Sequence, residues 1–198
     1  MAKEKKRKTQ TKRILELYHL FLTCLEVSRE EMRQGLSWNY NEKTKEWEFW
    51  NDRTISRDLT ILKYAGVPIL YSSRRKAFIQ PNKVEEKYPE KPNRYELYAQ
   101  LSKKEQQYIE RIKRLIKIME FVTYHEAAVE VWYRKTFPNK SMRTMQRDFK
   151  TLKDVKEPCY NIIYKRGWEY PDEPYMQEDE LPLGHYYLVN EYDIWRQR

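Results

Sequence analysis

An eleven-residue pattern occurs twice in this chain, and it limits the possible folds more than any other feature. RTISRDLTILK occupies residues 53–63, and RTMQRDFKTLK occupies residues 143–153, ninety positions later. In both copies apolar residues recur at i, i+4 and i+7, the spacing of one buried helix face. They are Ile55, Leu59 and Leu62 in the first copy and Met145, Phe149 and Leu152 in the second. We therefore expect two similar units.

The rest of the chain fits a division into two halves. Amphipathic helix patterns cover residues 11–26 and 108–121, upstream of the two copies. The stretch between the halves contains three prolines, which lack a backbone donor and disfavour helix in the preceding residue. We predict a first domain at residues 1–80, a linker at 81–101 and a second domain at 102–198.

The composition favours an anionic partner. The net charge of +9 and the pI near 9.3 are typical of proteins that bind nucleic acid, an acidic protein or an anionic membrane surface. Cys24 and Cys159 are far apart, which argues against a disulfide framework and a zinc site. No apolar run approaches the roughly 20 residues of a membrane span. We expect a cytoplasmic protein with neither metal nor other cofactor and without a membrane partner.

The outward faces of the two repeated helices carry hydrogen-bond donors. Asn51 or Asp52 can cap the first helix, and Ser141 can cap the second. A guanidinium near such a helix start can bind guanine in the major groove or a backbone phosphate. We assign Arg53 and Arg143 to bases or backbone and Arg57 and Arg147 mainly to phosphates, and we expect Asp58 and Asp148 in intramolecular ion pairs. The outward residues are Arg53, Ser56, Arg57 and Thr60, then Arg143, Gln146, Arg147 and Lys150.

A basic hairpin is expected directly after the first copy. Gly66 suits the end of a helix, and VPILY and AFI have the composition of two short strands. The connection SSRRK places Arg74, Arg75 and Lys76 at the hairpin tip. A helix followed by a basic hairpin is the pattern of a winged helix-turn-helix.

Residues 51–79, NDRTISRDLTILKYAGVPILYSSRRKAFI, resemble the DNA-binding domain of winged helix-turn-helix regulators of the deo-repressor type, including those with a WYL sensor domain. The resemblance extends over about 70 residues when SREEMRQGL is counted as the second helix. It implies a recognition helix with Arg53, Thr54, Ser56 and Arg57, and a wing with Arg74 to Lys76. In the second copy the matching residues are Arg143, Thr144, Gln146, Arg147 and Lys150. No sensor domain follows, so the implied fold is mainly α with small β-hairpins (α+β), as two tandem winged helix-turn-helix domains.

The first half carries an insert relative to the second. Ile14 precedes Arg53 by 39 residues, whereas the equivalent Ile112 precedes Arg143 by 31. The extra residues fall in 37–50, where alternating aromatic residues around NEKTKE predict a small hairpin. This hairpin could cover the module's own core, stack on single-stranded nucleic acid, or form a partner surface.

The second half repeats the pattern but ends in acidic sequence. HEAAVEVWYRKTF is expected as its second helix, and CYNIIYKRGW and HYYLVNEY as wing strands. Residues 91–168 hold 18 basic and 9 acidic side chains, against 2 and 8 in residues 169–198. The acidic segment could be solvated, screen the second recognition helix, dock on the first unit or bind another protein. At the other end, residues 1–13 hold 7 basic and 1 acidic side chain, typical of a DNA-binding arm or a solubilising tail.

Catalysis is not expected. His19, His125 and His185 are scattered, and four glycines leave no phosphate-binding loop. The sequence predicts a sequence-specific double-stranded DNA-binding transcriptional regulator of bacterial type. It leaves open an accessory or initiator protein for replication or transfer of a plasmid, phage or other mobile element. It also leaves open a second domain that binds another protein or a second copy of the chain.

Overall fold

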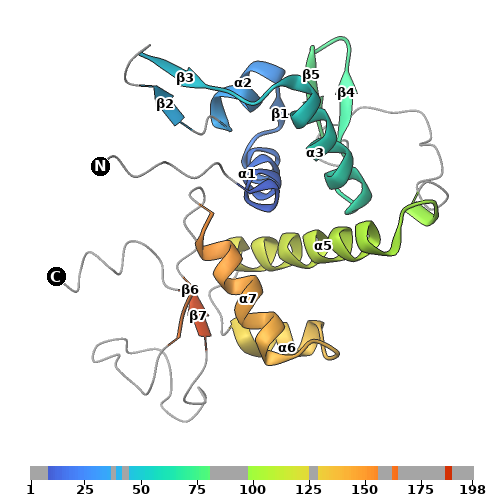
Figure 1. Ribbon diagram of the computed structural model, residues 1–198, viewed down its shortest axis with the longest axis vertical. Coiled ribbons are helices and arrows are strands. Elements are labelled where there is room, and N and C mark those ends of the chain that lie inside the picture. The colour runs from blue at the N-terminus through green and yellow to red at the C-terminus, as the bar shows by residue number, and fades with distance from the viewer. Residues whose placement is uncertain are drawn as a thin grey trace. The chain divides into compact units, whose positions relative to one another are not determined.

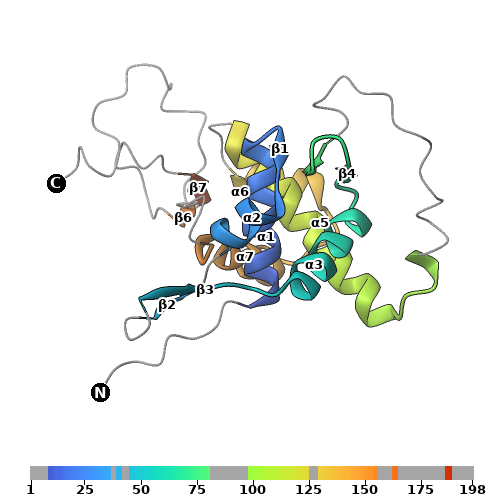
Figure 2. The same ribbon diagram turned by 90° about the horizontal axis from the view of Figure 1, so that it is seen from above.

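The computed structural model describes residues 9–36, 39–41, 45–80, 98–124, 129–155, 162–164 and 186–188 (Figures 1 and 2). It is mainly helical with small antiparallel sheets, which confirms the predicted α+β class. The chain divides into two compact units, Met1–Ile116 and Lys117–Arg198. Most of the predicted linker lies outside the described residues, so the predicted domain bounds stay predictions. We describe each unit by itself.

The described part of unit 1 combines several helices with a two-stranded sheet and a larger three-stranded sheet. Strand β5 lies in the centre of this sheet and pairs antiparallel with both β1 and β4, so that Ile79 stands opposite Glu26 and Leu70. The elements are α1 (Gln10–Thr23), β1 (Glu26–Val27), α2 (Arg29–Gly35), β2 (Asn39–Asn41), β3 (Glu46–Glu48), α3 (Asp52–Tyr64), β4 (Leu70–Ser72) and β5 (Ala77–Ile79). The first part of α5 (Lys103–Tyr124) also belongs to this unit.

Helix α1 supplies the apolar face on which unit 1 is built. Its Ile14, Leu17 and Phe21 are fully buried, as the i, i+3, i+7 spacing predicts. Helix α3 packs beside α1 and buries Leu59 and Leu62 from the repeated segment (Figure 1). Each such apolar side chain contributes roughly 1.5–3 kcal/mol through burial. The packing leaves the opposite side of α3 in solvent.

Local signals fix the ends of the helices. At the start of α2, Glu31 N–H donates to Ser28 Oγ while Glu31 accepts from Ser28 N–H, which is a capping box. At the end of α3, Gly66 has a φ of 96°, and Val67 N–H donates to Leu62 C=O over 3.0 Å. Glycine suits this left-handed position because it has no Cβ. The predicted role of Gly66 in ending the helix is confirmed.

The insert contains the predicted hairpin. Strands β2 and β3 pair antiparallel, with Tyr40 opposite Trp47. Just beyond β3, the side chain of Phe49 is 47% exposed, whereas Trp50 is half-buried and its ring centre lies 4.3 Å from the Arg13 guanidinium carbon. Residues 37, 38 and 42–44, which include Trp38, lie outside the described residues.

Unit 2 is built around the second copy of the repeat. Continuing from α5, it contains α6 (Val129–Thr136), α7 (Met142–Lys153), β6 (Ile162–Tyr164) and β7 (Tyr186–Leu188). Strands β6 and β7 pair antiparallel, with Ile163 opposite Tyr187, so the predicted second hairpin is confirmed. Aromatic rings fill the space between the helices: Phe121 stacks on Trp132 at 4.3 Å, and Tyr133 meets Phe149 edge-on at 5.6 Å. Within the acidic segment 169–198, only residues 186–188 are described.

Candidate nucleic-acid interface

Helices α3 and α7 carry the two copies of the repeat and bury the same positions. Between residues 51–62 and 141–152 the degree of burial differs at one position only, where half-buried Asp52 corresponds to exposed Met142. In each helix the buried residues are three apolar side chains and one aspartate. The repeat therefore produces two helices with the same inner and outer faces.

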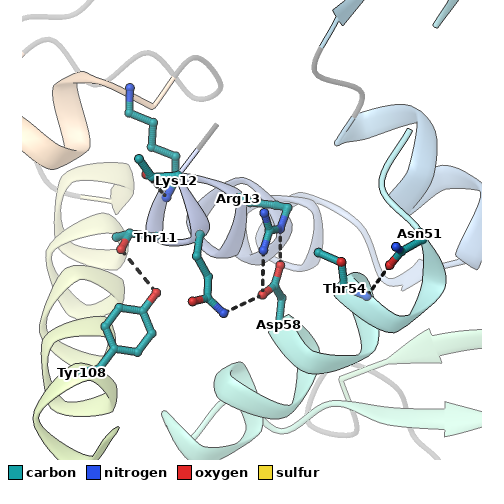
Figure 3. Close-up of polar contacts among 9 residues, drawn as sticks. Thr11, Lys12, Arg13, Asn51, Thr54, Asp58 and Tyr108 are labelled. Carbon is teal, nitrogen blue, oxygen red and sulfur yellow. Dashed lines mark hydrogen bonds and ion pairs between the residues drawn. The ribbon is translucent and has the colours of Figure 1, made fainter. Parts of the chain in front are cut away.

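The start of α3 is fixed by two side chains. Asn51 Oδ1 accepts from Thr54 N–H over 2.9 Å, so the residue that caps the helix is Asn51 (Figure 3). Asp52 accepts two hydrogen bonds from Arg33 Nη2, at 2.8 Å and 2.9 Å. This pair joins α2 to α3 and neutralises the one acidic side chain of the first turn of α3. The positive end of the helix is thereby left able to approach a phosphate.

A buried ion pair anchors the middle of α3. Asp58 is fully buried and accepts from the guanidinium of Arg13 on α1 (Figure 3). It also accepts from Gln10 Nε2 at 3.2 Å. The prediction that Asp58 belongs to an intramolecular ion pair is confirmed. Its partner Arg13 is 45 residues away. Because one buried carboxylate is shared by two donors on α1, it sets the rotation of α3 about its own axis.

A tyrosine hydroxyl from α5 contacts the start of α1. The hydroxyls of Thr11 and Tyr108 lie 3.3 Å apart (Figure 3). Burial raises the pKa of Tyr108 above the ordinary value of a phenol, so its hydroxyl keeps its proton to higher pH than an exposed tyrosine. This interaction adds α5 to the elements that hold the start of α1.

In unit 2, α7 is held by a helix cap and a buried aspartate at the matching positions. Ser141 Oγ accepts from Thr144 N–H over 3.3 Å and caps the helix as predicted. Asp148 is fully buried like Asp58, and it accepts from the hydroxyl of Tyr133 on α6 over 2.9 Å. The aspartate of each copy therefore faces its own unit and not a ligand, and the ion pair predicted for Asp148 stays a prediction.

The outward faces hold most of the predicted DNA-binding residues. All eight predicted outward side chains are exposed: Arg53, Ser56, Arg57 and Thr60 on α3, and Arg143, Gln146, Arg147 and Lys150 on α7. Thr54 and Thr144 are half-buried at the helix starts. The Thr60 hydroxyl donates to the Ser56 carbonyl over 2.9 Å, so this oxygen can only accept from a ligand.

The hairpin β4–β5 presents the predicted basic tip. Arg74, Arg75 and Lys76 are exposed in the turn between the strands. Arg75 Nη1 lies 3.1 Å from the Glu26 carboxylate of β1, because β1 and β4 flank the same strand. Arg74 and Lys76 are therefore better placed than Arg75 to bind an external anion.

The chemistry of this face is that of a donor surface. Within the described residues, no group of three or more His, Cys, Asp or Glu side chains is arranged to hold a metal ion. Over the same part of the chain, no helix combines the length and apolar character needed to cross a membrane.

Comparisons with protein-family models, curated proteins and solved structures find no match to this chain.

Proposed function

We propose that this protein binds double-stranded DNA in a sequence-specific way and regulates transcription, using α3 and α7 as two recognition helices in tandem winged helix-turn-helix units. The observation that carries the proposal is the duplicated outer face, in which two arginines one turn apart project from a capped helix. Two independent sets of buried interactions hold these faces outward. A packing role alone requires no such arrangement of exposed donors.

The element order of unit 1 supports the proposed fold. Helix α3 follows α2, and the basic hairpin β4–β5 follows α3, with β1 completing the sheet on β5. In this arrangement α3 enters the major groove and the hairpin tip lies along the adjacent backbone. Arg53 is in the first turn of α3, from which a guanidinium reaches guanine O6 and N7. Arg57, one turn later, binds a phosphate.

Fluorescence anisotropy on a duplex enriched from a random pool tests the proposal. The double variant Arg53→Ala with Arg57→Ala is expected to weaken DNA binding. Each lost hydrogen-bonded base contact should cost about 1–3 kcal/mol, which is roughly 5- to 150-fold in affinity. The matched control is Lys103→Ala with Lys104→Ala, which removes the same charge from exposed positions at the start of α5.

Equal affinities of the arginine variant and the wild type would contradict the assignment of α3 as a recognition helix. A decrease of the same size in the lysine control would show that total charge, and not α3, determines binding. DNA binding of this kind also suits an accessory protein for replication or transfer of a mobile element. A promoter–reporter assay run beside a plasmid-replication assay separates the two roles.

A further inference from the structure

The exposed cations are distributed differently in the two units. Residues 29–65, from α2 through α3, hold seven basic and seven acidic residues. Residues 129–155, from α6 through α7, hold seven basic and three acidic residues. In unit 1 exposed cations lie both on α3, with Arg53 and Arg57, and on the hairpin tip, with Arg74 and Lys76. In the described part of unit 2 they lie on the helices and in the turn before α7.

Burial increases the positive charge that α6 and α7 present to solvent. Of the three acidic residues in residues 129–155, Glu130 and Asp148 are buried and only Asp154 is exposed. All seven basic residues are exposed: Arg134, Lys135, Lys140, Arg143, Arg147, Lys150 and Lys153. Arg134 pairs with Glu130 at 2.8 Å, so six of the seven cations remain to attract an external anion. We call these seven residues the α6–α7 basic surface.

The positions of these cations match a duplex backbone. Arg143, Arg147 and Lys150 follow i, i+4, i+7 along the outer face of α7, a stripe about 10 Å long at 1.5 Å per residue. This length is close to the width of the DNA major groove, about 12 Å. Arg134 and Lys140 line one hollow of about 250 Å³ beside Ser141, so further cations lie at the start of α7. The cations therefore lie both at the start of α7 and along its outer face, where they can contact the phosphates on the two edges of the major groove.

We infer that the α6–α7 basic surface is the main phosphate-binding element of the chain, and that unit 2 supplies most of the salt-dependent affinity for duplex DNA. The inference rests on the proposed DNA-binding function and adds a division of roles to it. Unit 1 binds the backbone through its hairpin tip and Arg57. Unit 2 binds it through its recognition helix and the preceding turn.

The slope of log affinity against log salt concentration tests this division in the full-length chain. Each neutralised phosphate contributes about 0.9 to that slope. The triple variant Lys140→Ala, Arg147→Ala and Lys150→Ala is expected to reduce the slope by roughly 2–3. The matched control, Lys103→Ala, Lys104→Ala and Lys117→Ala, removes three exposed cations from α5 and should keep the wild-type slope. Circular dichroism melting checks that both variants fold.

The outcomes separate this inference from the proposed function. If wild-type protein binds duplex DNA but the α6–α7 variant keeps its slope, the inference fails and the function stands. If wild-type protein binds no duplex at low salt, the proposed function itself fails. The acidic residues 169–198 could instead occupy the surface. A slope that responds to the α6–α7 variant only after Glu178→Gln, Asp179→Asn and Glu180→Gln would demonstrate that occupancy and overturn the inference.

Discussion

Helices α3 and α7 have the same sequence pattern and nearly the same burial, but one described partner of each buried aspartate comes from a different element. In unit 1 the buried Asp58 is held by a charged partner, Arg13, from a helix 45 residues upstream. In unit 2 the buried Asp148 accepts from a neutral hydroxyl, that of Tyr133, 15 residues upstream. The repeat therefore preserves the orientation of the outer face, and in unit 2 a hydrogen bond from α6, the preceding helix, contributes to that orientation.

The largest expected difference between the units concerns these anchors. Arg13→Leu leaves the Asp58 carboxylate buried without its charged partner, which we expect to cost about 3–5 kcal/mol of unit 1 stability. Tyr133→Phe removes one neutral donor from Asp148 and should cost about 1–3 kcal/mol in unit 2. Hydrogen–deuterium exchange measures both, through the amides of α3 and α7 respectively.

A second variant serves as the control for the buried ion pair. Arg13→Leu combined with Asp58→Leu removes both charges and should recover much of the protection, because no buried charge remains uncompensated. Equal loss of protection in the single and double variants would contradict the importance of the charge. Loss of protection in α7 after Arg13→Leu would contradict the independence of the two anchors.

The next effect concerns sequence preference. Ser56 on α3 and Gln146 on α7 occupy the same exposed position of the repeat. A glutamine side chain can bind adenine N6 and N7 with two hydrogen bonds. A serine hydroxyl can both donate and accept, so it can bond to either kind of base. Gln146→Ser is expected to cost about 1–3 kcal/mol of discrimination at one base pair of the half-site bound by α7.

Competition binding with single-base variants of the enriched duplex measures this change. Ser56→Gln is the reciprocal variant and should add a preference in the other half-site. If Gln146→Ser weakened all the duplexes equally, Gln146 would bind the DNA backbone and the two helices would not differ in base reading at this position.

A smaller effect is expected at the end of α3. Gly66→Ala places a Cβ at a φ of 96°, where nothing lies within 4 Å of it, so the cost is conformational and not steric. We expect about 1–2 kcal/mol from the left-handed backbone. Thermal melting of the full chain detects it.

Gly35→Ala is the comparison variant for Gly66→Ala, because an added Cβ at Gly35 has a side-chain neighbour. A Cβ there would meet the end of the Leu20 side chain at 3.1 Å, and that side chain can move. Unchanged stability of the Gly66 variant would contradict the left-handed turn that joins α3 to the hairpin.

The smallest effect is a response to acid at two helix starts. Hydrogen bonds from Ser28 lower the pKa of Glu31, and hydrogen bonds from Ser102 lower the pKa of Glu105, below the ordinary value of 4.5. A lowered folded-state pKa stabilises the helix start fully above pH 4.5, and the stabilisation disappears as the pH falls through the lowered value. Carboxyl NMR titration should give midpoints below 4.5 for both groups. Midpoints at or above that value would contradict the two capping interactions.

Periodicity and end signals predict most of the local structure. The helix stripes, Gly66, the Ser141 cap and the hairpins all follow from short-range rules about which residues suit a helix face, a helix end or a strand. The apolar stripe alone predicts α5 from residue 108, whereas the helix begins at Lys103. The pattern SKKE at 102–105 is a capping box and is the sequence signal for this earlier start.

The long-range partners cannot be predicted in the same way. Spacing indicates that Asp58 is buried, but its pairing with Arg13 depends on how α1 crosses α3. The partial neutralisation of Arg75 depends on β1 joining the sheet beside β5, which places Glu26 near the hairpin tip. Three consecutive cations are therefore equivalent in sequence but not in the fold. Tertiary packing decides such pairings, and a single sequence shows it only indirectly.

The most direct test of whether α3 and α7 both bind DNA and prefer different bases is selection of duplexes from a random pool by the full-length protein, followed by footprinting. We expect two protected half-sites of different sequence, spaced by about 10–11 base pairs or a multiple if both helices enter one face of the DNA. Enrichment of one half-site alone, or of two identical half-sites, would contradict the proposal that α3 and α7 both read DNA and read it differently.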